Sequence, residues 1–171
     1  MFYRILACPC LLVYAFVPFS ALADNSQVNQ PVTTAEGYTI TLVSVRVSDG
    51  TASDNEPEKG KVYFIPCFEL TNGSGSDYSF MFDSNLTAAQ DGKDLGLANA
   101  YSVMKEIVFS KMKGNGYGLL EVNALPSGDT VIGETGWIID ADWKEVVVKY
   151  SPRAFGDVAA VFTFHPEDIL Q

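Results

Sequence analysis

Residues 37–48 read Gly-Tyr-Thr-Ile-Thr-Leu-Val-Ser-Val-Arg-Val-Ser, and this stretch decides the fold. Apolar and polar side chains alternate along it, which is the pattern of a β-strand with one buried face. The apolar face changes partway, because Ile40 and Leu42 point to one side and Val45 and Val47 point to the other. We therefore expect a β-bulge near Leu42, or a strand that passes there from one sheet to another.

The rest of the chain repeats this strand pattern between turns. Six further strands are predicted, at residues 62–70, 78–86, 119–122, 130–139, 144–150 and 158–164. Asn72 to Ser76 reads as a turn, so the strands on either side of it are expected to pair as a hairpin. Pro66 predicts a bulge or an edge position for its strand, since proline lacks a backbone N–H.

Residues 98–113 do not follow the strand pattern clearly. The apolar residues at helical spacing are Tyr101, Met104, Val108 and Met112, and those outside that series are Val103, Ile107 and Phe109. We expect a short helix or an irregular crossover here. The predicted fold class is therefore all-β, an antiparallel β-sandwich of about seven strands with one short helical or irregular crossover.

The core is predicted from the inward faces of these strands. Its expected members are Phe68, Leu70, Phe80, Phe82, Val131, Trp137, Ile139, Val146, Val148, Phe162 and Phe164. With 47% hydrophobic residues and 12% aromatic residues, the chain has enough apolar material to bury one core. This composition excludes a chain that is disordered throughout.

Three motifs at strand ends carry a resemblance to a known family. They are Gly37-Tyr38-Thr39-Ile40, Phe68-Glu69-Leu70-Thr71-Asn72 and the run from Leu125 to Gly133. In this order they resemble small secreted Ig-like domains of unknown function in Gram-positive bacteria, relatives of the mycobacterial immunoprotective extracellular antigen. The resemblance covers about residues 35–165. It implies an exported Ig-like sandwich without an established catalytic site, and its motifs mark turns rather than chemistry.

The N-terminus has the pattern of a signal peptide. An apolar run follows Arg4, and Ala21 and Ala23 supply the small residues that signal peptidase accepts before Asp24. We expect a signal peptide at 1–23, a flexible segment at 24–36 and the Ig-like domain at 37–171. Lipoprotein anchoring through Cys8 is the second interpretation, since Ile-Leu-Ala precedes that cysteine.

The charge balance limits the partners. The 171 residues include 21 acidic and 11 basic side chains, which give a formal net charge of −10. A chain this acidic repels nucleic acid and anionic lipid. We expect a protein or cell-surface partner, no nucleic acid, and no membrane contact once the signal peptide is removed.

The residue types needed for catalysis are sparse. Cys67 is the one cysteine beyond the signal peptide and lies in an apolar strand, so we expect a buried thiol and no intramolecular disulfide. His165 is the single histidine, which is too few for a zinc site or a histidine-based triad. We therefore predict no catalytic, cofactor-binding or metal-binding residues, although the acidic side chains of residues 48–60 leave calcium binding open.

These observations favour a secreted, non-enzymatic Ig-like binding module at or outside the cell envelope. An exported hydrolase and a structural envelope component are the alternatives. Arg153 and Phe155 are the candidate partner contacts, because Pro152 and Gly156 shape the loop that carries them. In the competing interpretation, Phe155 plugs the core and Arg153 pairs with Asp157.

Overall fold

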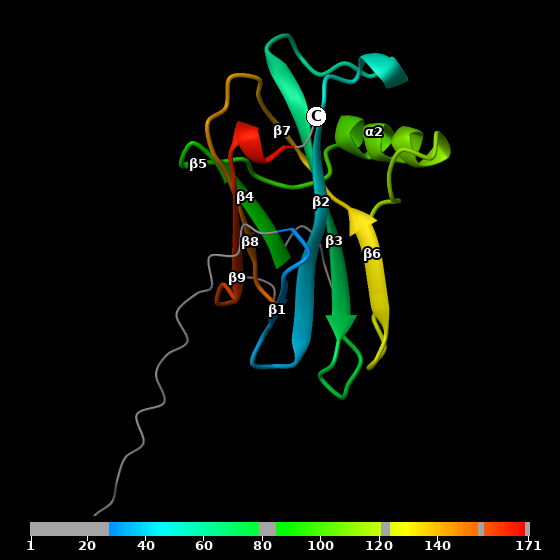
Figure 1. Ribbon diagram of the computed structural model, residues 1–171, viewed down its shortest axis with the longest axis vertical. Coiled ribbons are helices and arrows are strands. Elements are labelled where there is room, and N and C mark those ends of the chain that lie inside the picture. The colour runs from blue at the N-terminus through cyan, green and yellow to red at the C-terminus, as the bar shows by residue number, and fades with distance from the viewer. Residues whose placement is uncertain (1–27, 79–84, 121–123, 154–155, 170–171) are drawn as a thin grey trace, which may run out of the picture.

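The computed structural model describes residues 28–78, 85–120, 124–153 and 156–169, and in them two antiparallel sheets form an all-β sandwich (Figure 1). The first sheet contains β1 (Pro31–Thr33), β2 (Tyr38–Ser48), β3 (Lys61–Asn72), β6 (Thr130–Glu134) and β7 (Trp137–Asp140). Its order is β1-β2-β3-β6, and β7 also pairs with β3. The second sheet has the order β5-β4-β8-β9 and contains β4 (Leu86–Gln90), β5 (Lys93–Asp94), β8 (Val146–Tyr150) and β9 (Ala160–Phe164).

Among the described residues, three helical elements are fully defined beside the sheets. They are η1 (Thr51–Ser53), α2 (Tyr101–Met112) and η2 (Pro166–Asp168). The prediction of a short helical crossover within 98–113 is thus confirmed as α2. The described residues contain nine strands rather than about seven. The short β1 and β5 have no clear period-two signal, one predicted strand is divided in two, and another has only an isolated bridge.

The core lies between the two sheets. Phe68 of β3 packs on Phe162 of β9 with ring centroids 5.2 Å apart, and Phe64 packs on Phe164 at 5.1 Å. The predicted core residues that are buried here are Phe68, Leu70, Trp137, Ile139, Val146, Val148, Phe162 and Phe164. Val131 is only partly buried, and Phe80 and Phe82 lie outside the described residues.

The bulge expected near Leu42 is present. Leu42 pairs with Phe68 and Ser44 pairs with Cys67, so Val43 is the extra residue. All of β2 stays in one sheet, and the extra residue turns Val45 and Val47 to the core side occupied by Ile40 and Leu42. The same shift places Arg46 and Ser48 on the outer face of the first sheet.

The predicted hairpin between 62–70 and 78–86 is wrong. β3 pairs with β2, β6 and β7, whereas the strand that follows the turn, β4, belongs to the second sheet. The turn at Asn72 to Ser76 reverses the chain, but the chain then crosses to the other layer. Residues 79–84 lie outside the described residues, and Tyr78 forms an isolated bridge with Leu125.

The single strand predicted at 130–139 is also wrong, because it is divided into β6 and β7 by Thr135 and Gly136. This break lies opposite Pro66 in the central strand β3. The carbonyl oxygen of Pro66 accepts a hydrogen bond from Thr135 N at 3.1 Å on this side. Pro66 has no N–H to donate in return, so the ladder lacks one hydrogen bond here. A proline therefore occupies a central strand, and the edge position predicted for it is wrong.

Two other segments differ from their sequence patterns. Within 24–36, which the sequence predicts as flexible, β1 pairs with β2 in the first sheet, so the sandwich begins before residue 37. In the predicted strand 119–122, Leu119 forms an isolated bridge with Glu134, and residues 121–123 are not described.

Candidate interaction surface

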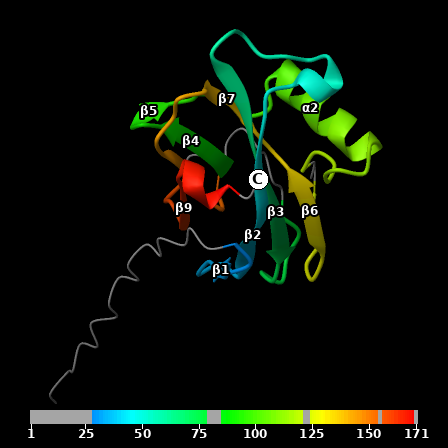
Figure 2. The same cartoon turned by 45° about the horizontal axis from the view of Figure 1, so that its top comes forward.

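Helix α2 covers part of the outer face of the first sheet, on the side away from the second sheet (Figure 2). Its buried side chains Val103 and Ile107 pack on Tyr63 and Ile65 of β3. These four residues form an apolar cluster separate from the main core. The sandwich therefore has a third, local layer at this end.

The opposite side of α2 is apolar and faces solvent. Tyr101 is 80% exposed, Met112 is 79% exposed and Val108 is 45% exposed, while Met104 is partly buried. Their spacing along α2 places these four side chains on one face of the helix. We name them the α2 outer stripe. Large apolar side chains this exposed on one helix face are typical of surfaces that contact another molecule.

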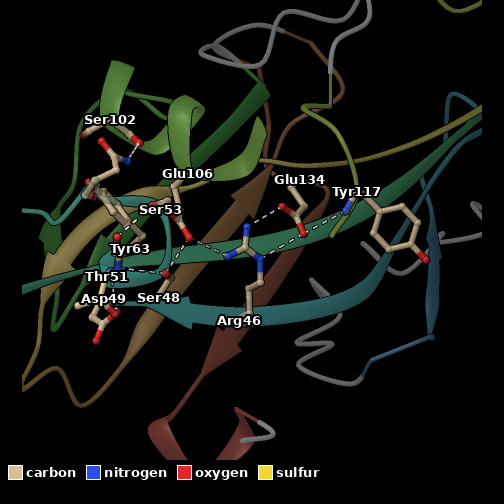
Figure 3. Close-up of polar contacts among 12 residues, drawn as sticks. Arg46, Ser48, Asp49, Thr51, Ser53, Tyr63, Ser102, Glu106, Tyr117 and Glu134 are labelled. Atoms are coloured by element: carbon tan, nitrogen blue, oxygen red, sulfur yellow. Dashed lines mark hydrogen bonds and ion pairs between the residues drawn. The ribbon is translucent and has the colours of Figure 1, made fainter. Parts of the chain in front are cut away.

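A buried ionic network holds α2 on the sheet (Figure 3). Arg46 of β2 donates to Glu134 of β6, with Nη2 2.9 Å from Oε2 and Nε 3.3 Å from Oε1. Arg46 Nη1 lies 3.7 Å from Glu106 Oε1 of α2. The side chains of both glutamates are 3% exposed and that of Arg46 is 26% exposed. One guanidinium thus links two buried carboxylates from two elements.

Glu106 is also held by two hydroxyl groups. Ser48 Oγ donates to Glu106 Oε1 at 2.8 Å, and Ser53 Oγ of η1 donates to Glu106 Oε2. On the same side, Asn55 Nδ2 donates to the carbonyl oxygen of Ser102 at 2.6 Å. The first half of α2 is therefore fixed to both β2 and the η1 loop, and the outer stripe has a defined orientation.

Glu134 holds the segment that follows α2. Tyr117 N donates to Glu134 Oε1 at 3.4 Å, and a Cβ atom at Gly116 would lie only 2.7 Å from that oxygen. A glycine is needed at position 116 because the backbone approaches the carboxylate closely. The network therefore fixes both α2 and the segment that follows it.

This arrangement fixes the position of α2. Both carboxylates are shielded from solvent: Glu134 accepts charge-assisted hydrogen bonds from Arg46, and Glu106 lies 3.7 Å from the same guanidinium. A shallow, open depression elsewhere, on the outer face of the second sheet, is lined by small and polar side chains that include Thr87, Ala89, Val147 and Lys149.

The site residues predicted from the sequence lie apart from this surface or are not described. Arg153 is exposed in the described part of the chain, whereas Phe155 lies outside it. The signal-cleavage residues Ala21, Ala23 and Asp24 also lie outside the described residues. These assignments stay predictions.

The acidic loop contains local contacts. Asp49 accepts hydrogen bonds from the hydroxyl and the backbone N–H of Thr51, and these bonds lower the pKa of its carboxyl group. Within the described residues, no group of three or more His, Cys, Asp or Glu side chains is arranged to hold a metal ion.

The thiol of Cys67 is buried, as the sequence predicts. Cys67 is 0% exposed and free, and it lies opposite Glu134 in the β3–β6 pairing. Burial, and after it the charge of Glu134, raises the pKa of the thiol to about 12. We expect a thiol reagent at pH 8 to label the folded protein slowly and the urea-unfolded protein rapidly, because the native thiol is both shielded and protonated. Labelling at the same rate in both states would contradict this burial.

The sequence analysis missed Arg46, Glu106 and Glu134. Arg46 was the detectable one, because without a bulge it would lie on the apolar strand face of Ile40 and Leu42, whereas a bulge before it turns it to the outer face. Its two partners are 60 and 88 residues away along the chain. Nothing in their local patterns pairs them with Arg46.

The described residues contain no helix that is long and apolar enough to cross a membrane. No protein-family model matches the chain, and no curated protein matches it.

Two solved structures of Bacillus proteins have a similar fold. The "putative lipoprotein (ycdA)" of Bacillus subtilis matches with a TM-score of 0.58 and 12% identity, over 84% of this chain and 40% of that protein. A "conserved hypothetical protein" of Bacillus anthracis matches with a TM-score of 0.51 and 14% identity, over 72% of this chain and 87% of that one. This chain thus spans less than half the length of the Bacillus subtilis protein. At these identities the likeness concerns the fold alone.

Proposed function

We propose that the protein is a secreted, non-enzymatic interaction module at or outside the cell envelope, and that the α2 outer stripe is its binding surface. The observation that carries this proposal is the exposure of Tyr101 and Met112 on a helix that is fixed to the sheet from beneath. Tyrosine and methionine are enriched at interfaces, where they bury large areas.

The fixed position of α2 favours binding. Glu106 ties the helix to β2 and to η1, so little conformational entropy is lost when the stripe is covered. If the backbone of α2 were mobile, the entropy lost on ordering it would offset part of the free energy gained by burying the four side chains. One face of α2 is therefore held by the buried network, and the opposite face carries the exposed stripe that we propose binds a partner.

Photo-crosslinking in the producing cell tests this surface. A photo-reactive amino acid in place of Val108 is expected to yield one discrete adduct, and the same amino acid in place of the exposed Thr87 on the second sheet is expected to yield none. Adding Met112→Gln should reduce the adduct from position 108, because it replaces an apolar contact with a polar side chain. No adduct from position 108, or equal adducts from both positions, would contradict the proposal.

The export route is a separate part of the proposal. We expect mass spectrometry of the native protein to give a chain that starts at Asp24, because Ala21 and Ala23 form the predicted cleavage motif. The alternative is a lipid-modified Cys8, and the description of the Bacillus subtilis protein as a putative lipoprotein motivates testing it. A chain that retains residues 1–23, or that begins at a diacylated Cys8, would contradict release as a free protein.

Kinship with the secreted Ig-like domains related to the mycobacterial antigen is likewise a proposal. It is supported by the strand-end motifs and by the two-sheet architecture. The loop at Arg153 and Phe155 stays a second candidate contact. The α2 outer stripe is favoured because its apolar side chains are exposed in the structure, whereas Phe155 lies outside the described residues.

A further inference from the structure

The segment that carries the α2 outer stripe bears exposed positive charges, although the protein as a whole is acidic. Residues 95–120 contain three lysines, Lys105, Lys111 and Lys113, and all three are exposed. The one acidic residue in this segment is Glu106, which is buried against Arg46. The exposed charges of this segment are therefore all positive, in a chain whose net charge is −10.

The lysines flank the stripe. On a helix, Lys105 neighbours Tyr101 and Val108 on one side of the stripe, while Lys111 neighbours Val108 from the other side. Lys113 follows the last helical turn, and its Nζ lies 5.4 Å from the centroid of the Phe109 ring. Among the described residues, none of the three lysines forms an ion pair. The side chain of Lys111 lies over Gly118, where a Cβ atom would be 2.7 Å from Lys111 Nζ.

Stabilisation of the helix accounts for only part of this pattern. Cations near the C-terminus of a helix interact favourably with its dipole, which explains Lys111 and Lys113. Lys105 lies in the middle of α2 and gains little from the dipole. The exposure of Tyr101 and Met112 is also unexplained by helix stability.

We propose that the α2 outer stripe, with its three lysines, docks on the surface of an anionic lipid membrane. This inference rests on the proposed function and names the partner of the same surface. Apolar side chains flanked by lysines are the composition of a helix that lies at a membrane interface. Lysine stems pack along the apolar region while their ammonium groups reach anionic headgroups, and tyrosine is enriched at the same depth.

The position of α2 favours a flat partner. The helix forms one outer side of the molecule, away from the second sheet (Figures 1 and 2). The exposed charges that α2 itself carries have a single sign. A protein groove is a competing occupant, and it would have to supply both a cavity and an acidic rim.

The net negative charge of the protein does not prevent this contact. The Debye length is about 8 Å at physiological ionic strength, so carboxylates farther than this from the membrane are largely screened. The exposed charges that α2 and its C-terminal end present to the headgroups are those of the three lysines. The expectation of no membrane contact came from the total charge. It took no account of the exposed lysines that are grouped on and next to α2.

Vesicle co-sedimentation tests the inference with the chain that begins at Asp24. This chain lacks the apolar signal segment but keeps every residue of the two apolar clusters. We expect it to bind vesicles of equal parts phosphatidylglycerol and phosphatidylcholine, and not vesicles of phosphatidylcholine alone. Binding should be lost in about 0.5 M salt, where the charges are screened.

Two charge variants distinguish the lysines of α2 from charge in general. Replacing Lys105, Lys111 and Lys113 together by glutamine is expected to weaken binding about tenfold or more. The matched control replaces the exposed residues Lys59, Lys93 and Lys149 by glutamine, which changes the net charge equally and should leave binding nearly unchanged. Met112→Gln, with the lysines intact, should also weaken binding.

The outcomes separate this inference from the proposed function. No binding to phosphatidylglycerol vesicles, or an equal loss in both triple variants, would overturn membrane docking. A protein adduct from position 108 without vesicle binding would leave the interaction module standing and give it a protein partner. Vesicle binding together with a lipid adduct from position 108 would support both proposals.

Discussion

Replacing Phe68 with alanine is expected to lower the free energy of unfolding by about 3–5 kcal/mol. Phe68 is 0% exposed on the central strand β3, and its ring lies 5.2 Å from that of Phe162 on the opposite sheet. The substitution removes apolar burial and leaves a cavity between two hydrogen-bonded sheets, which have little freedom to close it. Phe162→Ala is expected to cost a similar amount for the same reason.

Urea unfolding, followed by tryptophan fluorescence and far-UV circular dichroism, measures these costs. Ile132→Ala on β6 is the control, because Ile132 is 37% exposed and its truncation should change stability by less than about 1 kcal/mol. The double variant of Phe68 and Phe162 should lose less than the sum of the two single variants, since the rings contact each other. Costs below about 1 kcal/mol at both phenylalanines would mean that these side chains do not form the core.

The faces of the strands could be predicted from local patterns. Phe64, Phe68 and Leu70 alternate within β3, and their burial follows from the period of two. The phase change in β2 likewise predicted a bulge or a change of sheet near Leu42, and the bulge is found at Val43, because one extra residue reverses every later side chain. Information that lies within one strand was sufficient for these features.

The pairing of strands could not be predicted in the same way. The turn after Asn72 shows that the chain reverses, but it does not determine whether the next strand joins the same sheet or crosses to the other. The break between β6 and β7 depends on Pro66, which lies about 70 residues earlier in the chain. Both features depend on contacts between distant segments.

The orientation of α2 also depends on contacts between segments that are distant in the sequence. Apolar residues occur on two faces of the helix, one with Val103 and Ile107 and the other with Tyr101 and Met112. Hydrophobicity alone does not choose between them. The decisive residue is Glu106, which shares the first face and is buried because Arg46 and two serines lie opposite it. The apparent helical series in the sequence is therefore the solvent-facing one.

Arg46→Met is expected to cause the second large decrease in the free energy of unfolding. Methionine keeps much of the volume but leaves Glu106 and Glu134 buried without their shared cation. Breaking a buried ionic network by removing one partner costs about 3–5 kcal/mol, because an uncompensated charge stays in a poorly solvated site. The loss should appear in urea unfolding, and the contacts that fix α2 to β2 should weaken with it.

Two further variants show whether the cost comes from the buried carboxylates. Lys61→Met removes the cation of an exposed ion pair with Asp140 and should change stability little, since solvent screens that pair. Adding Glu106→Gln and Glu134→Gln to Arg46→Met should recover much of the loss, because neutral amides replace the unpaired charges and keep hydrogen-bonding capacity. If Arg46→Met is no more harmful than Lys61→Met, the network does not hold α2 in place, and the fixed orientation of the outer stripe must come from Val103 and Ile107 alone.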